Sequence, residues 1–143
     1  MDVSIRMLPK RGVLQCPLLL TRKTTVNLGR IGGCDAVVKA LKAFGGTDKD
    51  VAIHGCAVVY TLAFNTENRR ELGRVGGCDA VVQALRAFGG TDKNVALNGC
   101  AAVINLAYND AENKRVLLAA GATTALKASL ECGYTSQALK ILN

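Results

Sequence analysis

The sequence predicts an all-α protein built from repeated helical units, and three observations lead to this fold class. Residues 28–65 align without gaps on residues 72–109, with 28 of 38 positions identical. The resulting period of 44 residues lies in the range of helical solenoids. Within each copy the apolar residues recur every three or four positions, as on one face of an α-helix. Since half of the 143 residues are apolar, the chain can bury a core of its own as one domain.

The repeat divides the chain into four segments. Residues 28–65 form a first unit and residues 66–110 a second, and one added residue near position 110 shifts the third unit, 111–143, to a spacing of 45. This third unit ends early, so we expect a shortened set of helices there. Residues 1–27 form a basic leader, which we interpret as the remnant of an upstream repeat, with an organelle-targeting segment as the alternative.

Each unit is expected to begin with a short helix and to continue with one of medium length. Residues 66–74 are typical of a two-turn helix with Thr66 as its cap. Residues 77–88 predict the second helix, in which Asp79 lies in the first turn, where the helix dipole favours an acid. Gly89 and the glycine after it supply the end of this helix.

The third helix is the longest, and it starts at Thr91 or Asp92, whose oxygen can accept from the first free N–H groups. Its apolar positions advance by three and four and predict one buried face: Val95, Ala96, Gly99, Cys100, Val103, Leu106 and Ala107. A second apolar stripe of Leu97, Ile104 and Tyr108 widens this face. We therefore expect a helix that is packed by neighbours on both sides.

The opposite side of the third helix is polar or small in both copies. Steps of three and four join Asn94, Asn98, Ala101, Asn105 and Asn109 in the second unit, and Asp50, His54, Ala57, Thr61 and Asn65 occupy the same places in the first. We call these ten residues the polar stripe. Four of the ten differences between the copies fall on the stripe or beside it, at positions 50, 54, 60 and 61 of the first copy.

These features resemble the armadillo repeat family. The similarity consists of three expected helices per unit, a period in the low forties, a glycine that opens the second helix, and Asn-Leu-Ala at residues 105–107, and it covers residues 28–131. It implies a right-handed superhelical solenoid whose third helices line a concave groove for extended peptide segments of partner proteins. HEAT-like repeats, which have a similar length but two helices, are the alternative fold.

The resemblance also assigns roles to residues of the stripe. By motif match, Asn105 is the residue that hydrogen-bonds the backbone of a bound peptide, and an amide suits this task because it both donates and accepts. Thr61 departs from the motif, and Ala57 and Ala101 stand where the importin-α branch has tryptophan, which disfavours a receptor for basic nuclear signals. If Asn105 faces an open groove, its replacement by alanine would leave stability nearly unchanged.

The candidate peptide-binding residues are therefore the polar members of the stripe: Asn105, Asn98, Asn109, Asn94, Thr61, His54, Asn65 and Asp50. The competing interpretation is that they merely form the solvated side of a helix.

The functional hypothesis is a protein–protein interaction scaffold that binds an extended peptide of a partner along the concave face. Two backbone hydrogen bonds contribute about 1–3 kcal/mol, whereas micromolar binding needs about 8 kcal/mol. Two units alone would thus form a weak groove. The alternative is a structural or oligomerising segment, either a fragment of a longer array in a larger signalling protein or a chain that associates end to end.

Other functional classes find little support. His54 lies two residues from Cys56 and so on another helix face, and no second catalytic partner is evident, so we expect neither an enzyme nor a cofactor. A single histidine without Cys-x-x-Cys spacing predicts no metal site. Nucleic-acid binding is disfavoured because residues 1–30 carry a net charge of +5 while the other 113 residues carry +2, with few aromatic residues.

No apolar run in the sequence approaches the about 20 residues of a membrane span. The cysteines recur with the repeat as buried hydrophobes, which fits the cytoplasm or nucleus.

Overall fold

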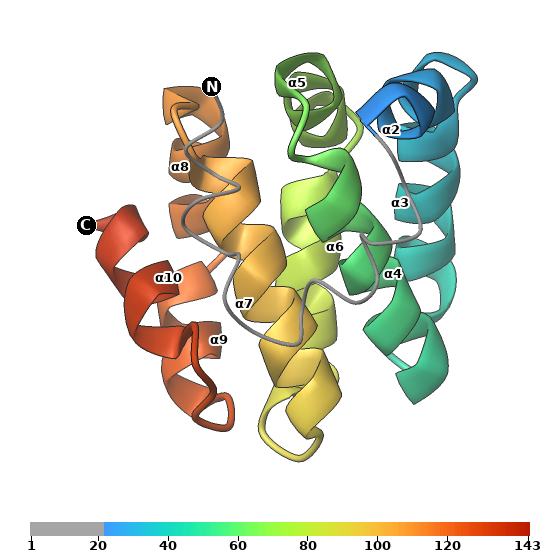
Figure 1. Cartoon of the computed structure of the whole chain (residues 1–143). Helices are drawn as coiled ribbons and strands as arrows, with labels where there is room; N and C mark the ends of the chain where they lie inside the picture. The colour runs from blue at the N-terminus through green and yellow to red at the C-terminus, as the bar shows by residue number, and fades with distance from the viewer. Residues whose placement is uncertain (1–21) are drawn as a thin grey trace.

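The computed structural model describes residues 22–143, in which helices joined by turns make up the fold and no strand occurs. The all-α expectation is confirmed for this part of the chain (Figure 1). Positions 1–21 of the predicted basic leader lie outside the described residues.

The helices form three sets of three, and in the first two sets their order is short, medium and long. The first set is α2 (Arg22–Arg30), α3 (Gly33–Phe44) and α4 (Lys49–Leu62). The second is α5 (Thr66–Arg74), α6 (Gly77–Ala84), which a π-helical turn, η3 (Leu85–Gly89), continues, and α7 (Lys93–Ala107). The third is α8 (Ala111–Ala119), α9 (Ala122–Ala128) and α10 (Thr135–Leu142), which is shorter than its counterparts. Helix α2 begins within the segment that the sequence assigns to the leader.

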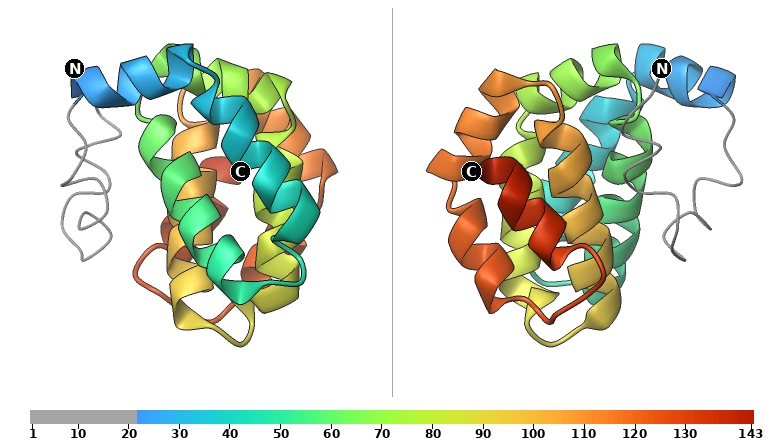
Figure 2. Two further views of the ribbon diagram at one scale, coloured as in Figure 1. Left: turned by 90° about the vertical axis from the view of Figure 1, so that its right-hand side faces the viewer. Right: turned by 60° about the vertical axis from the view of Figure 1, so that its left-hand side comes forward.

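The three kinds of helix lie in three rows. The short helices α2, α5 and α8 follow one another along one edge, at the top of Figure 1. The long helices α4 and α7 lie side by side with α10 next to α7, and the medium helices α3, α6 and α9 form the row behind them, as the turned views of Figure 2 show. Each set of three therefore packs against the next through all three of its helices.

The helix starts follow local capping chemistry. Asp92 caps α7, since its carboxylate accepts from the backbone N–H groups of Asn94 and Val95 at 2.9 and 3.0 Å. Helix α5 differs from the expectation, because its cap is Asn65, one residue before Thr66. The backbone of Asn65 is extended and its side chain accepts from the N–H of Asn68 at 2.9 Å. Thr66 is instead the first helical residue.

Glycines form the turns between the short and medium helices, and the preceding unit holds the second and third of these turns in place. Gly32, Gly76 and Gly121 have φ angles of 91°, 95° and 88°, a left-handed conformation that glycine adopts without a steric cost. The Lys42 ammonium donates to the carbonyl of Val75 at 3.0 Å, just before the second of these turns. Arg86 donates in the same way to the carbonyl of Ala120, just before the third.

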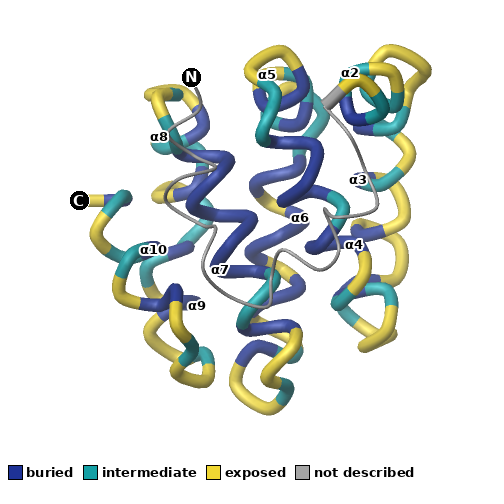
Figure 3. The backbone as a smooth tube through the Cα atoms, in the orientation of Figure 1, coloured by how far each residue is buried: buried dark blue, intermediate teal, exposed yellow. Residues whose placement is uncertain are grey.

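The core runs through the middle of the stack and encloses α7. Every residue of α7 from Gly99 to Ala107 is buried, and Figure 3 shows this helix as the dark centre of the molecule. The apolar face predicted for this helix is confirmed, because all seven of its residues are buried. Close packing also explains Gly99: a Cβ atom there would lie 2.4 Å from the Leu85 side chain.

We expect Leu106→Ala to lower the free energy of unfolding by about 2–5 kcal/mol, because Leu106 is fully buried in α7 and its loss opens a cavity. The matched control is Leu118→Ala on α8, where 44% of the side chain is exposed and the change should be within about 0.5 kcal/mol. Urea unfolding followed by circular dichroism measures both. Equal losses for the two variants would contradict this assignment of the core.

Candidate functional site

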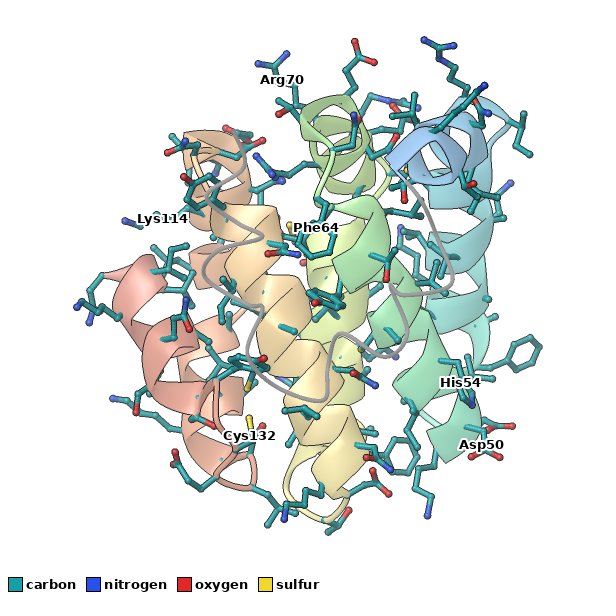
Figure 4. All side chains as sticks on the ribbon, in the orientation of Figure 1. Asp50, His54, Phe64, Arg70, Lys114 and Cys132 are labelled. Atoms are coloured by element: carbon teal, nitrogen blue, oxygen red, sulfur yellow. The ribbon has the colours of Figure 1, made fainter. Side chains whose placement is uncertain are left out.

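Within the long helices α4 and α7, the polar stripe is accessible where each helix begins. Asp50 and His54 on α4 and Asn94 on α7 are exposed, and Asn98 is half-buried. Figure 4 shows Asp50 and His54 close together on the first turns of α4. Because α4 and α7 lie side by side, these residues of two units belong to one surface, which we call the accessible stripe.

Farther along the same helices the stripe is buried. Ala57 and Thr61 on α4 are 4% and 1% exposed, and Ala101 and Asn105 on α7 are 0% exposed. The hydroxyl of Thr61 donates to the carbonyl of Ala57, one turn back in its own helix, at 2.9 Å. The stripe is thus a short open surface followed by an enclosed segment.

Asn105 is joined to the neighbouring unit. Its Nδ2 donates to the backbone carbonyl of Tyr60 on α4 at 3.0 Å. Its Oδ1 is buried and accepts no hydrogen bond. Only this oxygen is therefore left to meet a peptide N–H, and a peptide could reach it only after some neighbouring group moves. Peptide contact at Asn105 stays a prediction.

The bond from Asn105 solves a local problem at the end of α4. The last carbonyls of a helix have no partner within the helix and need other donors. The carbonyl of Tyr60 accepts from the amide of Asn105. The carbonyls of Ala63 and Phe64 accept from the guanidinium of Arg69 at 3.0 and 3.3 Å. The same guanidinium donates at 3.1 Å to the carbonyl of Tyr108, beyond the end of α7. Arg69, which is 4% exposed, thus links the ends of α4 and α7.

Asn98 makes a second contact of the same kind. Its Nδ2 donates to the carbonyl of Ile53 on α4 at 3.2 Å, two turns before the Asn105 contact. The two asparagines therefore fasten α7 to α4 at two heights. Asn98 differs from Asn105 because its side chain is only half-buried, so part of the amide still faces solvent.

The last two asparagines of the stripe have backbone roles. Asn65 caps α5, as described above. Asn109 is exposed and has a φ of 50°, a left-handed conformation that asparagine tolerates better than most residues. It follows Tyr108, the C-cap of α7, and lies in the turn toward α8. Both residues thus have a local reason to be asparagine that is independent of a partner.

Sequence reasoning missed another pair of asparagines, in the row of short helices. Asn68 donates from α5 to the carbonyl of Thr25 on α2 at 3.0 Å. Asn113 donates from α8 to the carbonyls of Arg69 and Leu106 at 3.1 and 3.0 Å. A signal for them exists in the sequence, since Asn68 and Asn113 are one repeat apart.

Glycines one unit earlier make room for these amides. A Cβ atom on Gly29 would lie 1.8 Å from Oδ1 of Asn68, and one on Gly73 would lie 1.9 Å from Oδ1 of Asn113. Gly29 and Gly73 are also twins in the repeat. The paired asparagines and glycines therefore form a second set of contacts between units, in the row of short helices.

Other site types find no geometry in the described part of the chain. Residues 22–143 contain no group of three or more histidine, cysteine or acidic side chains that could hold a metal ion. No helix among them is long and apolar enough to cross a membrane. A hollow between α5 and α8, of about 280 Å³, is lined by Arg70, Arg74, Asp110 and Glu112 among others, and it includes no residue of the polar stripe.

Comparison with known proteins adds no assignment. No protein-family model matches the chain, and neither curated proteins nor solved structures include a match.

The contact with Tyr60 changes the expectation for Asn105→Ala. Removal of the amide leaves a buried carbonyl without a donor, and it also removes the buried oxygen that has none, so we expect a net loss of about 1 kcal/mol in unfolding free energy. Asn94→Ala, on the exposed start of the same helix, should change it by less than about 0.5 kcal/mol. Chemical denaturation of both variants checks this order. If Asn105→Ala is as stable as Asn94→Ala, the Tyr60 contact contributes nothing.

Proposed function

We propose that this protein is a protein-binding scaffold that holds an extended peptide segment of a partner against the accessible stripe. One observation carries the proposal: the two copies differ on this surface. At two pairs of equivalent positions the copies have different polar side chains, Asp50 against Asn94 and His54 against Asn98. The first three are exposed and the last half-buried, so the divergence changes what a partner would meet.

The arrangement suits an extended chain. The stripe residues project from α4 and α7, which lie side by side and are fixed in register by the Asn98 and Asn105 bonds. A partner that crosses both helices would therefore meet a rigid row of donors and acceptors, with little ordering cost on the scaffold side. The amide of Asn98 still has its carbonyl oxygen for a peptide N–H, because only its Nδ2 is engaged with Ile53.

The fold that we propose for this scaffold is an armadillo-type array, a right-handed superhelical solenoid. Three helices in each unit, rather than the two of HEAT-type repeats, support it. The glycine at the start of each medium helix is a further similarity. The five cysteines of the described residues are free thiols, which supports a reducing compartment such as the cytoplasm or nucleus.

A second function, end-to-end association of the chain with another copy, is favoured by a different observation. On the outer side of the first unit Ile31 and Phe44 are 79% and 58% exposed, and Ala36 and Ala40 are exposed as well. We call these four residues the end face.

The twins of the end face are more deeply covered. Ala80 and Ala84 are 1% and 0% exposed, where α6 packs against α3, and Val75 and Phe88 are partly buried. Except for isoleucine in place of valine at position 31, the end face thus has the same residues as a surface that the fold covers between its own first and second units. A second copy is the occupant that we propose for it.

The peptide hypothesis is tested with a phage-displayed library of short random peptides selected on the immobilised full chain. For a selected peptide we expect the double variant His54→Ala, Asn98→Ala to weaken binding at least about tenfold, which corresponds to about 1.4 kcal/mol. The control, Gln83→Ala, changes an exposed side chain of α6 in another row and should bind as the parent does. Fluorescence polarisation gives the affinities. Selected peptides whose binding is the same in all three proteins would overturn the proposal.

Self-association is measured by sedimentation at increasing concentration. We expect the chain to form dimers or larger species in the high micromolar range, and Ala40→Glu, which adds a charge to the end face, to keep it monomeric. Ala87→Glu places the same charge at an exposed position of the second unit and should leave association unchanged. A parent chain that stays monomeric rules out this second function without affecting the first.

A further inference from the structure

Two thiols from different units meet beside the start of α10. Cys100 lies on α7 and is 0% exposed, whereas Cys132 precedes α10 and is half-buried. Both sulfur atoms contact the same hydroxyl, that of Thr135, at 3.3 Å from Cys132 and 3.9 Å from Cys100. Figure 4 places Cys132 between the segment that leads into α10 and the side of α7.

Local structure holds Cys132 in this place. Its backbone N–H donates to the Thr135 hydroxyl at 3.1 Å, which closes a tight turn at the start of α10. Its thiol also reaches across to the carbonyl of Ala96 on α7 at 3.9 Å. The sulfur is therefore positioned against α7, on the same side as Cys100, while its half-buried side chain stays within reach of small solutes.

The repeat provides a comparison within the molecule. Cys56 is the twin of Cys100 and has the same local sequence, but burial alone raises its pKa, to about 12. Burial likewise raises the pKa of Cys34 to about 11 and that of Cys78 to about 12. Cys132 has no twin, because alanine stands one repeat earlier at position 87. The Cys132 thiol therefore occurs in the third unit alone and is not part of the repeated sequence.

The electrostatics of the pair assign different roles to its members. A hydrogen bond from the Cys100 thiol lowers the pKa of Cys132 to about 6, and the Thr135 hydroxyl and the backbone N–H groups of Tyr134 and Thr135 add to this effect against the opposing effect of burial. The same contact with Cys132, followed by burial, raises the pKa of Cys100. The contact thus favours the thiolate at the accessible sulfur and the protonated thiol at the enclosed one.

We propose that Cys132 and Cys100 form a redox-active pair that a small hydroperoxide, such as hydrogen peroxide, converts to an intramolecular disulfide. The Cys132 thiolate attacks one peroxide oxygen, the O–O bond breaks, and hydroxide leaves, which yields a sulfenic acid. The Cys100 sulfur then attacks the Cys132 sulfur, the S–O bond breaks, and water leaves with the thiol proton. Two cysteines are oxidised by two electrons, and one peroxide is reduced to two water equivalents.

The disulfide would have a structural consequence at the end of the stack. In the reduced protein α10 is held to α7 by noncovalent packing alone, and α10 is short. The new bond would tie the segment before α10 to the centre of α7. Oxidation would thereby fix the last unit to the second. This inference does not depend on the proposed peptide or end-face functions, since neither surface includes these two cysteines.

The test uses the full chain carrying Cys16→Ser, because Cys16 lies outside the described residues. The reduced protein is treated with one equivalent of hydrogen peroxide, alkylated, digested without reductant and analysed by mass spectrometry. We expect the linked peptides of Cys100 and Cys132 as the main oxidised product. Cys56→Ser, the matched control, should give the same product, and Cys100→Ser should instead leave a sulfenic acid at Cys132 that dimedone traps. A different cysteine pair, or random pairing, would overturn the proposal.

A second measurement needs no substitution at the pair and so avoids variants that fail to fold. The rate of iodoacetamide labelling at each cysteine is followed against pH by peptide mapping. Because the thiolate is the reactive form, labelling of Cys132 should rise through about pH 6 and level off above it, and near pH 7 it should exceed that of Cys34, Cys56 and Cys78 at least tenfold. A Cys132 rate that still climbs beyond pH 8, as for an ordinary thiol, would contradict the proposal.

Discussion

The stack depends on side chains of one unit that donate hydrogen bonds to backbone carbonyls of another. A helix leaves its last carbonyls without partners, and a buried carbonyl without a donor costs about 1–3 kcal/mol. Here two such carbonyls have donors in a neighbouring unit, because Asn105 donates to Tyr60 near the end of α4 and Lys42 donates to Val75 just after α5. Asn113 makes a similar bond to the carbonyl of Arg69 within α5. Because such bonds have short reach and fixed direction, they also set how far one unit can slide or rotate against the next. Apolar burial supplies most of the stability, and these bonds define the register.

Because of this constraint, the asparagines fall into two groups, buried and exposed. Asn68, Asn105 and Asn113 are buried and hold adjacent helices together, and glycines at positions 29 and 73 leave room for two of them. Asn94 and Asn109 are exposed. Asn98 belongs to both groups, because one of its amide atoms is engaged with Ile53 while the side chain stays half-open. The polar stripe is therefore open in the first half of the long helices and buried in their second half.

The all-α class, the order of short, medium and long helices in the first two units and the buried face of α7 could be predicted from the sequence, because they depend on periodicity and on local capping. The identity of a cap is less certain from sequence: Asn65 and Thr66 are both good caps, and only the backbone conformation distinguishes them. Burial of Asn105 could not be predicted, because helical spacing gives the direction of a side chain along its own helix but not the distance to the next helix. The contacts of Asn68 and Asn113 could not be predicted for the same reason, because each joins residues some 40 positions apart. The meeting of Cys100 with Cys132 also lies beyond pattern reasoning, since it depends on how the irregular segment before α10 folds back on α7.

The asparagines form internal joints and a separate polar surface, and the exchange of their side-chain amide protons with solvent is the sharpest test of this division. In the uniformly ¹⁵N-labelled full chain, the NH₂ groups of Asn68, Asn105 and Asn113 should exchange with solvent far more slowly than those of Asn94 and Asn109. Asn98 should lie between the two groups. If all six NH₂ groups exchange at the rate of an exposed amide, the joints do not exist in solution, and the division between a buried frame and an accessible stripe is wrong.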